Sequence, residues 1–193
     1  MGLLHDFYMG STVAYVGDFT IAELSACALD GDVSRVDFAY VLSDCPEDVS
    51  SRARIILSRV DERCVVASWS AAWAHNAILC TPEQHTVALR GGLRLRLAPD
   101  LRYDIAQMSF EPTDVMGTLG AFVTTPLRTA IDLARFVSRD RRLQGALMVL
   151  LRAAKANNDD VRNVLERGKN LPFKQRAYRR LNAALVGANM AEG

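Results

Sequence analysis

The pair Thr125-Pro126 constrains the fold of this chain more than any other feature of its sequence. A threonine that can cap a helix, followed by the proline that suits the first helical position, predicts a helix that begins there. After this pair apolar residues recur at helical spacing, whereas before it short apolar runs are separated by turn residues. The order predicts an α+β fold with a central mixed β-sheet with helices, followed by an all-helical C-terminal third.

The first 45 residues predict a small module of one helix and a strand pair. The segment 20–23, Thr-Ile-Ala-Glu, matches a capping box, so a helix is expected from there to about Ala28. Beyond a turn at 30–32, alternation predicts a half-buried strand, with these residues facing inward: Val36, Phe38, Tyr40 and Leu42. This is what remains of a winged helix-turn-helix reduced to its last helix and wing. We therefore divide the chain into a degenerate winged-helix-like module, 1–45, and an α/β domain that ends in a helical segment, 46–193.

The rest of the chain predicts short elements before residue 126 and helices after it. Helices are expected over 46–60, 71–76, 139–156, 159–168 and 172–186, and strands over 64–67, 101–110 and 121–124. Ser68 or Ser70 is expected to cap the second of these helices. A hairpin is expected over 85–97 with a three-residue loop at 90–92, because only this register sets Val87 opposite Leu95 on one buried face.

The formal net charge of +1 conceals an uneven distribution of charge along the chain. Residues 1–51 hold nine acidic side chains and one basic side chain, while residues 126–193 hold fourteen lysines and arginines against six acids. Such an asymmetry concerns the partners of a protein more than its fold. The sequence has neither an apolar run of about 18 residues nor a start of the secretory type, which predicts a cytoplasmic protein that does not contact membranes.

The sequence contains no recognisable catalytic or metal-binding motif. Its cysteines are 16 to 19 residues apart, too far for the close pairs of zinc sites and redox dithiols: Cys27, Cys45, Cys64 and Cys80. Its three histidines, His5, His75 and His85, have no carboxylate or cysteine at ligand spacing. No glycine-rich phosphate loop or serine-hydrolase elbow is present. We therefore expect no enzymatic activity, no cofactor and no metal, and interpret His75 and His85 as core or surface residues.

Clustered arginines are the chemical signal that remains, because guanidinium groups neutralise phosphates and release counterions. Three clusters are found: at the tip of the expected hairpin, at the start of the helix expected over 139–156, and along the last helix. The candidate nucleic-acid-binding residues are Arg90, Arg94, Arg96, Arg139, Arg141, Arg142, Arg176, Arg179 and Arg180. The alternative interpretation is a solvated helix face without a ligand. The helix at 20–28 offers Glu23 and no basic residue, which argues against DNA contact there.

Four segments resemble an actinobacterial branch of the AbiEi-type antitoxins of type IV toxin–antitoxin systems. They are TIAELSACALDGDV (20–33), SWSAAWAH (68–75), VTTPLRTAIDLAR (123–135) and LPFKQRAYRRL (171–181). The resemblance implies an N-terminal winged helix-turn-helix that binds operator DNA and a C-terminal α/β domain implicated in neutralising a nucleotidyltransferase-type toxin. The third segment is the most specific, and a structural role is expected for its residues Thr125, Pro126, Arg128 and Asp132, since Arg128 and Asp132 are spaced to interact on one helix.

Two functions are therefore expected as alternatives. The first is a transcriptional regulator or antitoxin that binds DNA, a cognate toxin, or both. The chain departs from the family in its short and acidic first module, so DNA contact is expected from the basic C-terminal helices and the 90–96 hairpin instead. The second is a protein-interaction module that has lost DNA binding, whose acidic N-terminus contacts a basic partner such as a toxin. Neither alternative fixes the operator sequence or the oligomeric state.

Overall fold

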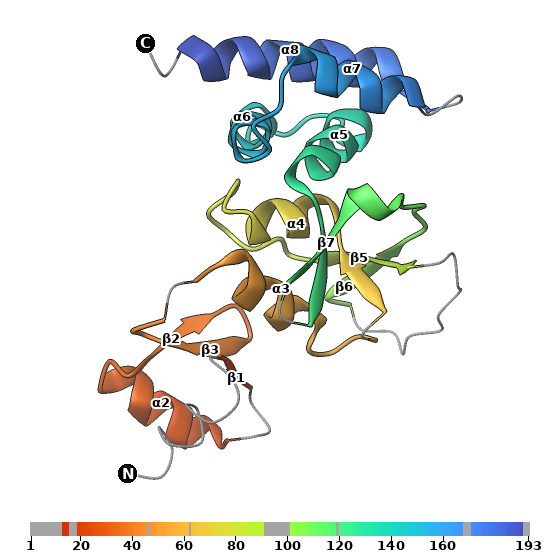
Figure 1. Ribbon diagram of the computed structural model, residues 1–193. Helices are drawn as coiled ribbons and strands as arrows, with labels where there is room; N and C mark the ends of the chain where they lie inside the picture. Colours follow the sequence, from red (N-terminus) through yellow and green to blue (C-terminus); the bar gives the residue numbers. More distant parts are fainter. Residues whose placement is uncertain are drawn as a thin grey trace.

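The protein has an α+β fold in which three parts follow one another along the molecule (Figure 1). The computed structural model describes residues 13–15, 19–45, 47–61, 63–90, 101–118, 120–167 and 171–190. A small N-terminal module lies at one end, a five-stranded sheet with two helices lies in the middle, and helices cover the other end. The predicted fold class, with its all-helical C-terminal third, is confirmed.

The N-terminal module is a three-stranded sheet with one helix packed on it. Its elements are β1 (Val13–Tyr15), α2 (Ile21–Leu29), β2 (Val33–Val36) and β3 (Ala39–Leu42). The strand order is β1-β3-β2, with both pairings antiparallel. The predicted capping box is confirmed, since the Thr20 hydroxyl accepts from the Glu23 amide at 3.2 Å and the Thr20 amide donates to the Glu23 carboxylate at 2.9 Å. The sequence analysis did not predict β1.

The prediction of one strand with Val36, Phe38, Tyr40 and Leu42 facing inward is wrong. A tight turn at Asp37 and Phe38 divides the segment into β2 and β3, and Asp37 has a φ of 56°. Val36 pairs with Ala39 across this turn, so the inward-facing positions shift from even-numbered to odd-numbered residues there. As a result Ala39 and Val41 are fully buried, while Phe38 and Tyr40 are half-buried. The alternating pattern concealed this turn because Phe38 suits a strand and Asp37 fell on the polar face of the alternation.

The two faces of the small sheet belong to different packing groups. On one face Val33 and Leu42 pack against Leu24 of α2. On the other face the sheet contributes to the main core, through Val13, Val36, Ala39 and Val41. The predicted boundary at 45/46 thus separates two sheets, while the apolar core runs across it.

The central part is a mixed five-stranded sheet in the order β6-β5-β4-β8-β7. Its elements are α3 (Val49–Leu57), β4 (Cys64–Val66), α4 (Ser68–Ala74), β5 (His85–Leu89), β6 (Tyr103–Ala106), the 3-10 helix η2 (Pro112–Asp114), β7 (Val115–Thr118) and β8 (Ala121–Thr124). The pairs β4–β8 and β5–β6 are parallel, and β4–β5 and β7–β8 are antiparallel. The predicted strands at 64–67 and 121–124 are confirmed, and the one at 101–110 is shorter than predicted.

The predicted hairpin over 85–97 falls partly outside the described residues, since its second strand and Arg94 and Arg96 lie there. Its first strand is β5, and both edges of this strand carry other partners. Val87 pairs with Val66 of β4 on one side and with Ile105 of β6 on the other. The prediction considered only a neighbour in sequence as the partner of this strand, and it did not pair the strand with those expected at 64–67 and 101–110.

Two predicted helix starts in this part need correction. The helix expected from residue 46 begins at Val49, where Asp48 caps it by accepting from the Ser51 amide at 2.8 Å; Pro46 lies outside the described residues. The cap expected at Ser68 or Ser70 does not form, because α4 begins at Ser68 after Ala67, without a side-chain cap. Ser70 lies inside this helix and is completely buried.

Four helices form the remaining end of the molecule. They are α5 (Pro126–Phe136), α6 (Leu143–Ala153), α7 (Asn158–Arg167) and α8 (Lys174–Met190). The predicted start at Thr125-Pro126 is confirmed, with the Thr125 hydroxyl accepting from the Arg128 amide at 3.4 Å. Ala130, Ile131 and Ala134 are buried. Figure 1 shows α7 and α8 as the outermost layer, with α5 and α6 between them and the sheet.

Candidate nucleic-acid interface

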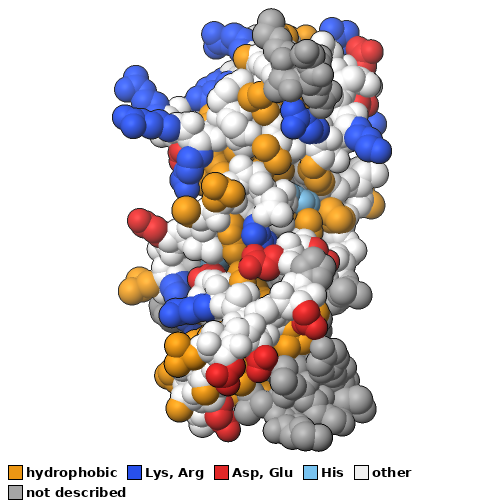
Figure 2. Space-filling model, turned by 90° about the vertical axis from the view of Figure 1, so that its left-hand side faces the viewer, with side chains coloured by type: hydrophobic (Ala, Val, Ile, Leu, Met, Phe, Trp, Pro, Cys, Tyr) orange, Lys and Arg blue, Asp and Glu red, His pale blue; other side chains and the backbone are white. Residues whose placement is uncertain are grey.

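Acidic and basic side chains lie at opposite ends of the folded protein, as they do along the sequence. In residues 126–190 the described part of the chain has eight exposed cationic side chains against two exposed acids, whereas in residues 19–61 it has six exposed acids against two exposed cations. Figure 2 shows the consequence on one face, where blue side chains gather over the helical end and red ones prevail toward the N-terminal module. The two ends of the molecule therefore offer surfaces of opposite sign.

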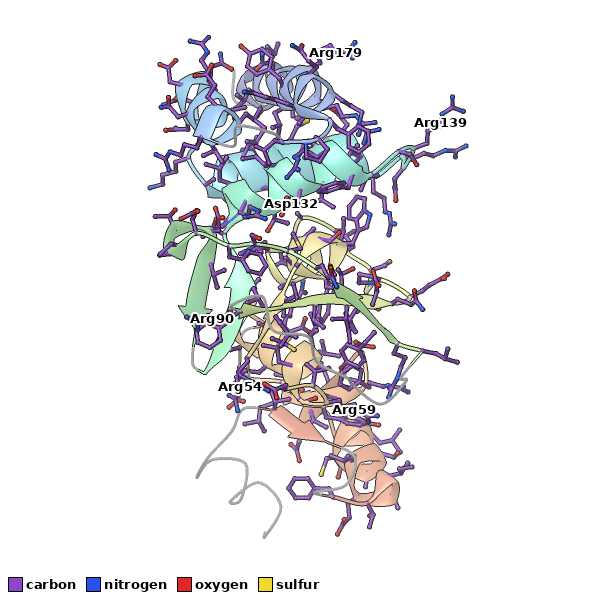
Figure 3. All side chains as sticks on the ribbon, turned by 90° about the vertical axis from the view of Figure 1, so that its right-hand side faces the viewer. Arg54, Arg59, Arg90, Asp132, Arg139 and Arg179 are labelled. Atoms are coloured by element: carbon purple, nitrogen blue, oxygen red, sulfur yellow. The ribbon has the colours of Figure 1, made fainter. Side chains whose placement is uncertain are left out.

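Three predicted arginines lie in the connection between α5 and α6. They do not open a helix as expected, because α5 ends at Phe136 and α6 begins only at Leu143. Arg139 and Arg141 are exposed, and Arg139 projects away from the body of the protein (Figure 3). Arg142 forms an ion pair with Asp140 at 2.7 Å and stacks on Trp69 at 4.8 Å. The hydrogen bond from Arg142 lowers the pKa of the Asp140 carboxyl.

The three predicted arginines of α8 divide into two kinds. Arg180 donates to the carbonyls of Ala134 and Ser138 at 3.0 and 2.9 Å, and Arg176 donates to the carbonyl of Arg135. These carbonyls lie at the end of α5, where helical hydrogen bonds run out, so both arginines cap that helix. Arg179, on the outer side of α8, is exposed (Figure 3). Of the three, Arg179 alone presents its guanidinium group to solvent without such a role.

The predicted hairpin cluster does not join this surface. Arg90 follows β5 and stacks on the ring of Phe122, with its guanidinium carbon 4.2 Å from the ring centroid. Figure 3 shows it on the flank of the sheet, far from Arg139 and Arg179. Arg94 and Arg96 lie outside the described residues. The surface that the structure assembles is therefore the helical end, with Arg139, Arg141, Arg142 and Arg179.

Two exposed aromatic side chains at the helical end were missed by the sequence analysis. Phe136 ends α5, Phe173 precedes α8, and they are 53% and 55% exposed. Their ring centroids lie 6.2 Å apart in an edge-to-face contact, with interplanar angle 85°. The Arg135 guanidinium covers Phe136 at 4.5 Å, and that of Arg176 covers Phe173 at 4.3 Å. The available signal was that each phenylalanine lies at a helix end with a cationic neighbour in the sequence, Arg135 before Phe136 and Lys174 after Phe173.

The motif in α5 forms a buried network of charges. Arg128 donates to Asp132 at 2.7 Å, forms an ion pair with Asp114 before β7, and donates to the Ser109 carbonyl at 3.1 Å. Arg135 lies 3.4 Å from the second oxygen of Asp132. Burial raises the pKa of Asp132, while Arg128 and Arg135 favour its charged form. The geometry supports the expected structural role, since the network joins α5 to the segment 109–114.

A groove of 520 Å³ lies beside this network, between α5 and α7. Its floor is apolar, with Leu127, Ile131 and Val164, and its rim carries charges of both signs, including Asp160 and Arg167. A rim of mixed sign does not select an anion or a cation. The groove therefore adds no definite chemistry to the basic surface.

Ser70, His85 and Asp37 form a hydrogen-bonded row that resembles a catalytic triad in outline only. His85 Nε2 lies 2.6 Å from Asp37 Oδ2, and His85 Nδ1 lies 3.2 Å from Ser70 Oγ. Ser70 is completely buried and accepts from the Thr86 amide at 2.8 Å, so no substrate reaches its hydroxyl. Asp37 lies in the β2–β3 turn and His85 in β5, so the row fastens the N-terminal module to the central sheet.

His75 is also a core residue: burial lowers its pKa, and its Nε2 donates to the Thr124 carbonyl at 2.7 Å.

Comparison with known proteins adds no family to this picture. No protein-family model matches the sequence, and no curated protein matches it. Among the described residues no three His, Cys, Asp or Glu side chains come together in a way that could hold a metal ion. Along the same residues, no helix has the length and apolar character needed to cross a lipid bilayer.

Proposed function

We propose that this protein is a nucleic-acid-binding regulator, of the kind that its resemblance to AbiEi-type antitoxins implies, and that it contacts phosphates through its helical end. The observation that carries the proposal is the excess of exposed cations there, eight against two acids among the described residues of 126–190. Arg139, Arg141 and Arg179 are exposed and take part in none of the helix caps and ion pairs described above.

Physical chemistry favours this surface over the N-terminal module. A cation that neutralises a phosphate releases condensed counterions, and this release drives binding that is largely blind to sequence. Around α2 the exposed charges are acidic, among them Glu23, Asp30 and Asp32, which would repel phosphates. The helix that corresponds to a recognition helix in a winged-helix fold is thus the less suitable one for DNA.

The salt dependence of binding tests this proposal. The affinity for a labelled DNA duplex of about 20 base pairs is measured by fluorescence anisotropy between roughly 50 and 200 mM salt. The variant Arg139→Ala/Arg141→Ala should lower the magnitude of the slope of log K against log salt by about 2, because two phosphate contacts are lost.

A matched control is available at the other end. Arg35→Ala/Arg59→Ala removes the two exposed cations of residues 19–61, so it changes the net charge equally. This variant should leave the slope unchanged within error. Equal slopes for the two variants would remove the assigned surface, and absence of binding even at the lowest salt would refute the function itself.

The outer face of α2 favours a second candidate function, protein interaction through the N-terminal module. Ile21 and Leu29 are 65% and 89% exposed, and they lie eight residues apart on one face with Ser25 between them. Exposed acids surround this face, so an amphipathic groove with a basic rim would complement it. A nucleotidyltransferase-type toxin is the partner that the family resemblance suggests.

Co-expression with the product of the adjacent gene tests the second candidate. Leu29→Lys should abolish co-purification, because a charge would enter the apolar face. Leu79→Lys is the matched control, since Leu79 is 92% exposed and lies after α4, away from α2. Equal recovery of the partner with both variants would show that α2 does not form the contact.

A further inference from the structure

The two phenyl rings at the helical end are held in place from both sides. Arg135, next to Phe136, donates to the carbonyl of Pro172, next to Phe173, at 3.1 Å. In return Arg176 of α8 donates to the Arg135 carbonyl. These reciprocal bonds join the end of α5 to the start of α8 and fix the backbone from which both rings project.

Phe173 keeps its exposed position in a strained backbone conformation. Its φ is 60°, in the left-handed region that a bulky residue rarely adopts. Strain of this kind persists where the surrounding structure imposes it, and it concentrates at functional sites. A strained backbone that holds a phenyl ring more than half exposed therefore indicates that the ring has a contact to make.

The packing of the rings leaves an aromatic surface open. Guanidinium groups cover one face of each ring, and the edge-to-face contact covers at most one further face. Phe136 and Phe173 are nevertheless 53% and 55% exposed, so part of their aromatic surface is open to solvent.

Cations for a phosphate backbone flank these rings. Arg139 and Arg141 follow Phe136 in the α5–α6 connection, and Lys174 follows Phe173 directly. Exposed aromatic rings among cations are the arrangement with which proteins bind unpaired nucleotides, because a base stacks on a ring while its phosphates contact the cations. In a duplex the base faces are already stacked on one another and cannot reach a side chain.

We infer that Phe136 and Phe173 form a stacking platform for single-stranded nucleic acid, with Arg139, Arg141 and Lys174 contacting its phosphates. This inference rests on the proposed nucleic-acid binding and names its substrate class. It gives the helical end a preference that phosphate contacts alone would not provide, since those are made equally well to paired strands.

The test compares a strand of about 15 thymidines with a duplex of similar length, by anisotropy at one salt concentration. Phe136→Leu/Phe173→Leu keeps the apolar volume and removes the aromatic faces. We expect it to weaken binding to the single strand by about tenfold or more and to change duplex binding less than about twofold. Phe136→Tyr/Phe173→Tyr, which retains the rings, should bind the single strand like the unaltered protein.

Controls separate the possible outcomes. Leu29→Ala removes an exposed apolar side chain at the opposite end and should have no effect, and melting curves confirm that each variant is folded. If the leucine variant binds the thymidine strand as tightly as the unaltered protein does, the platform is refuted, while arginine-dependent duplex binding would still uphold the proposed function. Absence of binding to both nucleic acids would refute the proposed function as well.

Discussion

The N-terminal module and the helical end differ in what their charged side chains do. In the N-terminal module most acids are exposed, and Asp37 is hydrogen-bonded to His85 of the central sheet. At the helical end the arginines have two roles. Some form ion pairs with Asp132 or hydrogen bonds to carbonyls within the protein, namely Arg128, Arg135, Arg176 and Arg180, while others face solvent. The net charge of a segment therefore predicts the charge of its surface only when the side chains that take part in buried contacts are left out.

This difference also concerns how each region tolerates the loss of a charge. The Asp132 side chain is 3% exposed between two arginines, which stay charged in the folded protein, whereas the Asp37 side chain is 22% exposed. The buried network around Asp132 should therefore be less tolerant than the row around His85.

Asp132→Asn should give the largest effect, a loss of about 3 kcal/mol or more in the free energy of unfolding. Asp132 is 3% exposed between Arg128 and Arg135, and the substitution leaves buried guanidinium groups without their shared carboxylate. Asp37→Asn, its counterpart in the N-terminal module, should cost only about 1 kcal/mol, because the Asp37 side chain is 22% exposed and an asparagine oxygen can still accept a hydrogen bond from His85. Urea denaturation measures both values. A larger loss for Asp37→Asn would invert the comparison.

Adjacent arginines of α8 should separate folding from binding. Arg180→Ala removes hydrogen bonds to carbonyls at the end of α5 and should cost about 1 to 3 kcal/mol of stability. Arg179→Ala, on the exposed side, should change stability by less than about 0.5 kcal/mol and weaken binding to nucleic acid. Thermal melting and anisotropy on both variants provide the measurement. Equal stability losses would show that the capping contacts contribute little.

The capping box of α2 should give the smallest effect, and it depends on pH. Hydrogen bonds from the backbone and side chain of Thr20 lower the pKa of Glu23 below its usual 4.5. Because the folded value lies below the unfolded one, the contribution of the carboxylate is complete above about pH 4.5 and is lost as pH falls through the folded value. NMR titration should show a lowered pKa, which returns toward 4.5 in Thr20→Ala. An unchanged pKa in that variant would mean that the hydroxyl is not its cause.

Local signals explain which parts of this fold the sequence predicted. The capping box at Thr20 and the helix start at Thr125-Pro126 involve neighbours in sequence, and both form as predicted. The parallel pairing of Val66 with Val123 brings together residues far apart in the chain, and no local pattern contains it. The turn at Asp37 was missed because Phe38 suits a strand and Asp37 matched the polar face of the alternation.

The candidate surface shows the same limit. The arginine clusters of the helical end were visible in the sequence, but the roles of their members were not. Arg176 and Arg180 reach carbonyls 41 and 46 residues away, so their capping role depends on how α8 packs on α5. Phe136 and Phe173 come together through that same packing. Residue type predicted the positive charge of this surface, and tertiary contacts determine which side chains belong to it.

The apolar core that runs across the 45/46 boundary has a consequence for fragments of this protein. A chain that began at residue 46 would uncover the core surface that now packs against Val36, Ala39 and Val41, and would leave His85 without Asp37. Newly exposed apolar surface of this kind promotes aggregation. The acidic module therefore acts as a built-in cover for the central sheet, and a protease that removed it would produce an insoluble remnant rather than a freed binding domain.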